Sequence, residues 1–209
     1  TLSATASNPT FTEGSGSGVQ GSAVSVFSGA SVSTVEAGQT IAGLTFTVSG
    51  VVDGTNEKII VDGTTLTLSS GSTGTTQTNG LSYSVTFNGT NKVSTVVLSG
   101  GSLTASAAQT LVNGIQYQNT SLDDPTSGSR VVTLTQLVDS GSNVAPNSNT
   151  ATLSIASTVT VTPINDAPTL SATASNPTFT EGSGSGVQGS AVSVFSGASV
   201  STVEAGQTI

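Results

Sequence analysis

The sequence predicts an all-β protein, an antiparallel β-sandwich with one short helix, repeated in a tandem array. Three observations support this prediction. Val, Thr, Ser and Gly fill most positions, and β-branched side chains favour strands while the 25 glycines supply turns. Apolar and polar residues alternate in several stretches, as in half-buried strands. Finally, residues 1–41 return letter for letter as residues 169–209, and a long, fixed period indicates tandem repeats.

The repeat sets the expected domain boundaries. Residues 1–168 form one complete sandwich, and residues 169–209 begin the next, identical repeat. A permuted unit, residues 42–209, contains the same segments, so the sequence leaves open which copy completes the sandwich. Residues 169–209 alone are too few to bury a core. A single elaborated sandwich and two smaller subdomains both fit this length, and the short internal loops favour the single sandwich.

The strands follow from alternation and turn signals. Residues 1–21 are rich in Ser, Gly and Thr, and residues 23–27 form a short strand that a turn at Ser28-Gly29 ends. Further strands are predicted at residues 44–48, 57–61, 66–68, 81–87, 93–98, 115–118, 131–138 and 153–161.

Turns and irregularities are expected at specific places between these strands. The Asp-Gly pair at residues 53–54 marks a turn. The pair at residues 62–63 lies between apolar runs and predicts a hairpin, since a type I′ turn needs positive φ at both central positions. Residues 71–80 are predicted to form a polar loop. The ambiguous parity of residues 131–138 indicates a bulge.

One segment has helical rather than strand spacing. Between Ser102 and Gly114, apolar residues recur at intervals of three and four positions. Ser102 is the expected N-cap and Asn113-Gly114 the expected stop. This helix is predicted to lie in a crossover between strands.

Composition excludes several classes of partner and reaction. Eleven acidic residues face three basic ones, giving a net charge of -8, and no basic stripe is present to bind nucleic acid. Membrane insertion is not expected, because no apolar run approaches the ~18 residues that span a bilayer. The chain is not expected to be an enzyme, since without His or Cys the usual catalytic triads and zinc sites are missing. Adjacent Asp123 and Asp124 would point to opposite faces of an extended chain.

The acidic residues suit calcium, which takes about six to eight oxygens from carboxylates, carbonyls and amides in irregular loops. The candidate ligands lie at expected strand ends: Glu13, Asp123, Asp124, Asp139, Asn165 and Asp166. Asp and Asn also initiate turns. That alternative stays open for the junction residues, and it is the preferred interpretation for Asp53 and Asp62.

Two stretches resemble a known family. The junction Ile164-Asn165-Asp166-Ala167-Pro168 resembles the calcium-binding linker of cadherins, as it occurs in bacterial cadherin-like tandem repeats. The run from Tyr117 to Gly141 is similar to repeats of giant surface adhesins of the RTX and biofilm-associated type. The resemblance implies extracellular immunoglobulin-like sandwiches on the bacterial cell surface, strung end to end, with calcium stiffening the junctions.

The resemblance also assigns individual residues. It makes Glu13 the early acidic ligand and gives Asn165 and Asp166 the role of linker ligands; Asp123, Asp124 and Asp139 match acidic loop positions. Three features depart from the family pattern: Pro163 stands where the cadherin linker begins with Asp, the second Asn after Asp166 is missing, and the Asp-Arg-Glu motif is absent.

We therefore expect a structural spacer repeat of a large extracellular adhesin or surface fibre, whose partners are the neighbouring identical repeats. Two alternatives remain. In the first alternative, the chain is a cell-adhesion module that binds a glycan, ice or a protein. In the second, it is a filament subunit that exchanges strands with other copies of itself. The copy that packs against the strand at residues 44–48 bears on the second alternative.

Overall fold

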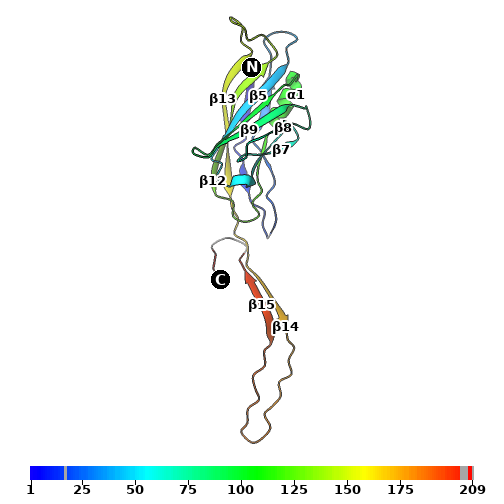
Figure 1. Ribbon diagram of the computed structural model, residues 1–209, viewed down its shortest axis with the longest axis vertical. Coiled ribbons are helices and arrows are strands. Elements are labelled where there is room, and N and C mark those ends of the chain that lie inside the picture. Colours follow the sequence, from blue (N-terminus) through cyan, green and yellow to red (C-terminus); the bar gives the residue numbers. More distant parts are fainter. Residues whose placement is uncertain (17, 203–206, 209) are drawn as a thin grey trace. The chain divides into compact units, whose positions relative to one another are not determined.

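The computed structural model describes residues 1–16, 18–202 and 207–208. The chain divides into two compact units, Thr1–Ile164 (unit 1) and Asn165–Ile209 (unit 2) (Figure 1). The predicted all-β, sandwich-like fold with one short helix is confirmed. No helix in the described ranges has the length and apolar character needed to cross a membrane.

Strands account for most of the regular structure. In unit 1 they are β1 (Leu2–Ala6), β2 (Thr10–Thr12), β3 (Val24–Ser25), β4 (Phe27–Val32), β5 (Ile41–Ser49), β6 (Glu57–Val61), β7 (Thr64–Thr67), β8 (Ser72–Thr75), β9 (Ser82–Asn88), β10 (Val93–Ser99), β11 (Gln116–Asn119), β12 (Gly128–Asp139) and β13 (Thr150–Thr162). Helix α1 spans Ala105–Asn113, and a 3-10 helix spans Gly54–Asn56. Unit 2 contains β14 (Thr169–Ala174) and β15 (Phe195–Ser201).

Two sheets pack around one core in unit 1. Among the described residues, the larger sheet has seven strands in the order β2-β13-β12-β5-β10-β9-β8, and the smaller has four in the order β3-β11-β6-β7. Strands β1 and β4 form a separate two-stranded antiparallel sheet. The sandwich is antiparallel as expected, except that β2 pairs parallel to β13. This exception joins the second strand of the unit to its last strand, and both run towards the same end of the sandwich.

The predicted alternation in β5 reflects burial. Leu44, Phe46 and Val48 point into the core and are at most 4% exposed. The first copy of the repeated stretch completes this core, since its Phe11 and Phe27 belong to the same buried cluster. The sequence had left open which copy takes this place.

The Asp-Gly turn between β6 and β7 forms as predicted, with φ of 50° at Asp62 and 75° at Gly63. The Asp62 carboxylate has a second role, because it accepts hydrogen bonds from Thr76 Oγ1 at 2.5 Å and from the backbone N of Asn79 at 3.0 Å. The prediction that residues 71–80 are entirely loop is wrong. Residues 72–75 pair with β9 as the edge strand β8, whose polar sequence hid it from the alternation test.

Helix α1 lies in the predicted segment and ends at Asn113 as expected. The predicted cap at Ser102 is wrong. Thr104 is the N-cap, and its Oγ1 accepts a hydrogen bond from the backbone N of Ala107 at 3.1 Å. The helix starts later than expected because Leu103 is still extended and forms a β-bridge with the first residue of β5.

Two further irregularities concern strands. The predicted bulge in β12 is confirmed, since its pairing with both neighbours shifts between Leu134 and Gln136. The predicted turn at Ser28-Gly29 is wrong. Strand β4 continues through both residues, and an irregularity in its pairing with β1 lies beside Gly29, whose φ is 58°.

The chain enters unit 1 at one end of the sandwich, which we call the start end, and leaves it at the opposite end, which we call the exit end. At the exit end, β12 begins and β13 finishes, with Gly128 opposite Val161. At the start end, Val138 of β12 lies opposite Thr150, the first residue of β13. Thr1 shares a surface pocket with Thr150, so the chain enters at the start end (Figure 1).

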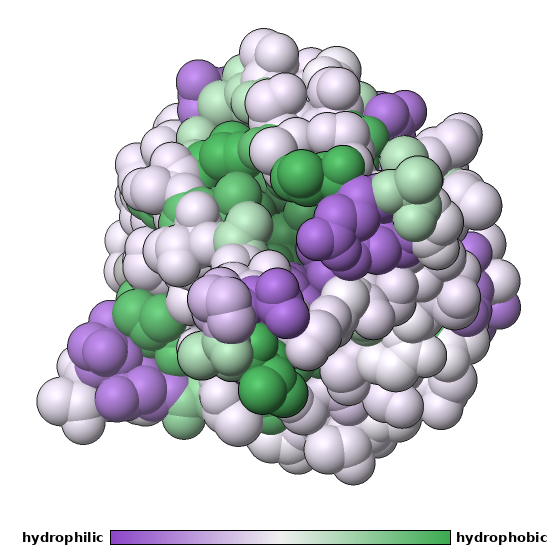
Figure 2. Space-filling view, turned by 90° about the horizontal axis from the view of Figure 1, so that it is seen from above, coloured by the Kyte–Doolittle hydropathy of each residue, from purple (hydrophilic) through white to green (hydrophobic). Residues whose placement is uncertain are grey.

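Figure 2 looks onto the start end of unit 1, where apolar surface lies in a hollow among polar residues. Near this end, an apolar pocket opens between α1 and the beginning of β5. It is lined by Ile41, Gly43, Leu44, Leu81, Leu103, Ala108, Leu111, Val112 and Leu137.

Candidate functional site

Glu13 lies at the exit end of unit 1, directly after β2. Its backbone N donates to Thr162 O at 3.1 Å, which extends the parallel pairing with β13. Its side chain is buried, and Oε2 accepts a hydrogen bond from the backbone N of Ile164 at 3.0 Å. A carboxylate of the first copy therefore binds Ile164, the first residue of the junction.

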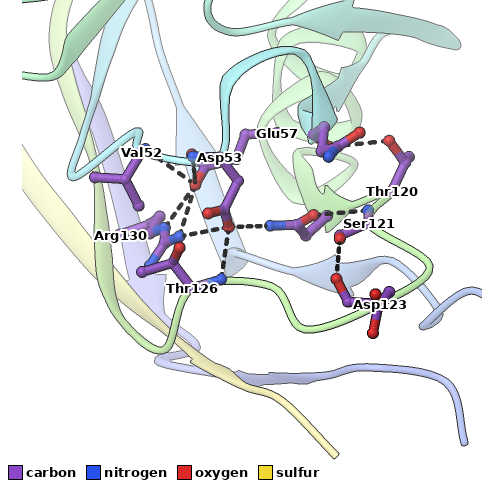
Figure 3. A network of polar contacts seen from close by, with 10 residues as sticks. Val52, Asp53, Glu57, Thr120, Ser121, Asp123, Thr126 and Arg130 are labelled. Carbon is purple, nitrogen blue, oxygen red and sulfur yellow. Dashed lines mark hydrogen bonds and ion pairs between the residues drawn. The ribbon is translucent and has the colours of Figure 1, made fainter. Parts of the chain in front are cut away.

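A buried ion network lies at the same end (Figure 3). Arg130 donates from Nε at 2.9 Å and from Nη2 at 2.7 Å to Glu57 Oε1. Its Nη2 also donates to Asp53 Oδ2 at 3.0 Å. We call these three residues the Arg130 clamp. Arg130 is 1% exposed and Glu57 0%, so solutes do not reach the paired atoms in this conformation.

Strand periodicity explains why these charged side chains point inward. Glu57 begins β6, whose alternate residues Glu57, Ile59 and Val61 are buried. Arg130 has the same parity in β12 as the buried Val132 and Leu134. The ends of two strands from different sheets thus place opposite charges in the interior, where each charge compensates the burial of the other.

The clamp also fixes the loops around it. Glu57 Oε1 accepts from the backbone N of Val52 at 3.2 Å and of Asp53 at 3.3 Å. Asp53 Oδ2 accepts from Asn119 Nδ2 at 2.6 Å and from the backbone N of Thr126 at 3.1 Å. Two loops distant in sequence, residues 50–56 and 119–127, are held together through the Asp53 carboxylate, which Arg130 also binds (Figure 3).

The electrostatics of the clamp are set by burial. Burial raises the pKa of the Glu57 carboxyl above its ordinary value of 4.5, against the opposing effects of Arg130 and of backbone N–H donors. Within the described residues, Glu57 Oε2 is buried with no hydrogen-bond partner, which favours a proton there. Burial, aided by the Glu57 charge, also raises the pKa of the Tyr117 hydroxyl well above its usual range.

The loop that the clamp braces carries two predicted ligands, Asp123 and Asp124. Asp123 is half-buried, and its backbone O accepts from Ser121 Oγ at 2.6 Å. In the described part of the chain, Asp123 Oδ1 is buried with no hydrogen-bond partner. Asp124 is exposed and has a φ of 50°. The two carboxylates therefore lie in different environments.

The structure separates the other candidate ligands. Asp139 lies at the start end, where β12 finishes, and its Oδ1 caps the turn by accepting from the backbone N of Gly141 at 2.8 Å. Asn165 and Asp166 belong to unit 2, where Asn165 Oδ1 accepts from Gln207 Nε2 at 2.8 Å and Asp166 is 7% exposed. Within unit 1, the predicted set is divided between two ends of the sandwich.

The carboxylates do not form a ready-made metal centre. Over residues 1–16, 18–202 and 207–208, no three acidic side chains come close enough together to hold an ion. Calcium takes about six to eight oxygens, so an ion here would depend mainly on carbonyl, amide and water oxygens. The acidic residues singled out in the sequence do not by themselves supply a calcium site.

The Arg130 clamp was not predicted from the sequence. Asp53 was interpreted as a turn residue, and it does precede the 3-10 helix, but its carboxylate also binds Arg130. One signal was present: Arg130 is the only Arg of the chain, and it lies two residues before Val132 at the start of a strand. Its partners could not be identified, because they are more than 70 positions away.

Comparison with models of known families, with curated proteins and with solved structures found no match.

Proposed function

We propose that this chain is a structural spacer repeat of a large extracellular adhesin or surface fibre on a bacterial cell. The observation that best supports the proposal is the placement of the chain ends of unit 1 at opposite ends of the sandwich, followed by a second copy of the first residues. Repeats joined in this way add length with each copy. The resemblance of residues 164–168 to cadherin-like linkers supports the extracellular setting.

The length that each repeat adds follows from β13. This strand has 13 residues and runs from the start end to the exit end. At ~3.3 Å per residue it spans about 40 Å, and the junction adds roughly 10 Å. Each repeat is then expected to lengthen the molecule by about 50 Å.

Small-angle X-ray scattering tests this directly on recombinant chains of one, two and three repeats. The maximum dimension should rise linearly, by about 50 Å per repeat. A matched control replaces residues 163–168, which contain two prolines, by a flexible Gly/Ser linker; it should give shorter average dimensions. An increase of less than half the expected value in the natural chain would refute the spacer function.

Calcium binding at the junction is the second part of the proposal. It is supported by the resemblance of residues 164–168 and by Glu13, whose carboxylate is held beside Ile164. Because no three carboxylates converge in the described residues, the affinity should be low. We expect a dissociation constant of about 10⁻⁴ to 10⁻³ M, as in extracellular modules.

The calcium test is independent of the scattering test. Calorimetric titration with calcium chloride should show binding to the wild type and to Glu36→Gln, which changes an exposed acid at the start end. Glu13→Gln and Asp166→Asn should weaken binding; in Glu13→Gln, the new side-chain amide oxygen would still accept from the backbone N of Ile164. No heat of binding at millimolar calcium would reject the calcium part and leave the spacer function standing.

A further inference from the structure

The second copy of the repeated stretch keeps one pairing of the first, that of β1 with β4. In β1 and β4, Leu2 lies opposite Val32 and Ala6 opposite Phe27. In β14 and β15, the corresponding residues pair in the same register, with the irregularity at the same place. Asn8 and its counterpart Asn176 have φ values of 43° and 44°. Within the described part of unit 2, the β14–β15 pairing is therefore present without counterparts of the two larger sheets.

The surroundings of the two copies differ completely. In the first copy, the apolar side chains are buried: Leu2 is 8% exposed, Phe11 1%, Val26 0%, Phe27 1% and Val32 4%. In the second copy, the same side chains face solvent: Leu170 is 71% exposed, Phe179 59%, Val194 57%, Phe195 64% and Val200 49%. The second copy thus presents an exposed apolar face. The first copy shows which residues bury the same side chains.

Residues 42–164 bury the apolar side chains of the first copy, and we call these residues the acceptor body. The first copy adds β2 to the edge strand β13 and β3 to the edge strand β11. Phe11 packs edge-on against Tyr117, with ring centroids 5.8 Å apart. Polar contacts fix the position: Thr158 N donates to Asn8 Oδ1 at 2.9 Å, and Ala30 N donates to Asn113 Oδ1 at 2.9 Å. Without the first copy, the acceptor body would leave two sheet edges and part of its core open.

The second copy cannot take this place in its own molecule. To do so, Thr169 would have to occupy the position of Thr1, beside Thr150 at the start end. Ile164 lies past the other end of β13, about 40 Å away along the strand. Residues 165–168, which join Ile164 to Thr169, reach at most about 18 Å when fully extended.

We propose that residues 169–209 form a complementing segment, which takes the place of residues 1–41 on the acceptor body of a second copy of this chain. Residues 1–209 contain two such segments and one acceptor body. While the first copy stays seated, exchange gains no burial and the chain remains monomeric. When the first copy is displaced, molecules join head to tail, each completing the next. The inference does not depend on the proposed spacer function.

Substitutions in the full chain test the inference, because the two copies offer matched positions. Phe11→Asp with Phe27→Asp disables the first copy and leaves the second intact. This variant should form a ladder of head-to-tail oligomers, at integer multiples of the monomer mass by light scattering. The matched control, Phe179→Asp with Phe195→Asp, should stay monomeric with a wild-type melting temperature.

The variant with all four substitutions distinguishes specific complementation from aggregation of a misfolded chain. It has an open acceptor body and no competent segment, so it should not assemble alone but should form a 1:1 complex with wild-type chain. In that complex, Thr178→Cys on the wild-type chain and Thr160→Cys on the fourfold variant should form a disulfide, since Thr160 lies opposite Thr10, the counterpart of Thr178. The chain has no native cysteine to interfere.

Three results would overturn the inference. The first is a Phe11→Asp/Phe27→Asp variant that remains monomeric. The second is a fourfold variant that assembles without wild-type chain, since that would be nonspecific aggregation. The third is a fourfold variant that fails to bind wild-type chain, whether or not it folds.

Discussion

The exact repeat offers an unusually clean test of burial, because Phe27 and Phe195 have identical sequence neighbours on both sides. We consider Phe27→Ala and Phe195→Ala. Phe27 is 1% exposed in the core of unit 1, whereas Phe195 is 64% exposed in unit 2. Any difference between the two variants therefore comes from tertiary environment alone, since local propensity changes equally at both positions.

The magnitude follows from the buried area. A buried Phe removes about 200 Å² from water, and replacement by Ala loses roughly 130 Å² of it. At ~25 cal/mol per Å² this is about 3 kcal/mol, and an unfilled cavity raises the cost to about 3–5 kcal/mol. Phe195→Ala should change the free energy of unfolding of unit 1 by less than about 0.5 kcal/mol.

Urea unfolding in dilute solution provides the assay. Both tyrosines of the chain, Tyr83 and Tyr117, lie in unit 1, so their fluorescence reports this unit specifically. The urea dependence of the free energy should stay constant, and the midpoint should fall only for Phe27→Ala. Equal losses in the two variants would refute the assignment of the first copy to the core.

Three other predictions concern unit 1, each measured as the free energy of unfolding in urea. Arg130→Met should lower it by about 3–5 kcal/mol, because two buried carboxylates lose their partner, while Lys92→Met at an exposed turn should have almost no effect; similar losses would contradict the clamp. Since the folded-state pKa of Glu57 is raised, the folded chain binds a proton more tightly there than the unfolded chain, so its contribution to stability should grow as pH falls towards 4.5 and be lost as pH rises through the folded-state pKa. Glu57→Gln should remove this pH dependence, and an unchanged pH profile would argue against the raised pKa. Thr104→Ala should lower the free energy of unfolding by about 1 kcal/mol, because the N-cap is lost, and Ser102→Ala should lower it much less. The reverse order would instead support Ser102 as the N-cap, as predicted from the sequence.

The fold class could be predicted because its signals are local. Alternation in β5 and the Asp62-Gly63 turn depend on neighbouring residues, and both appear in the structure as expected. Strand β8 could not be found in this way. Residues 72–75 bury little and take their order from pairing with β9, a partner that no local pattern identifies.

The candidate site was predictable only in part. The sequence identified Glu13 as a residue near the junction, and its carboxylate contacts Ile164. It could not foresee that Asp139 lies at the other end of the sandwich, since that depends on the direction of β12. The Arg130 clamp depends on contacts between strands far apart in the sequence, which residue spacing does not encode.

The parallel pairing of β2 with β13 has a mechanical consequence. If tension is applied between Thr1 at the start end and Ile164 at the exit end, the two strands are pulled in opposite directions along their axes. Their hydrogen bonds, together with the contact of Glu13 with Ile164, then bear load in shear and must break together. An antiparallel pair at the same place would peel apart one bond at a time. The two ends of unit 1 are thus linked through a geometry that resists stretching.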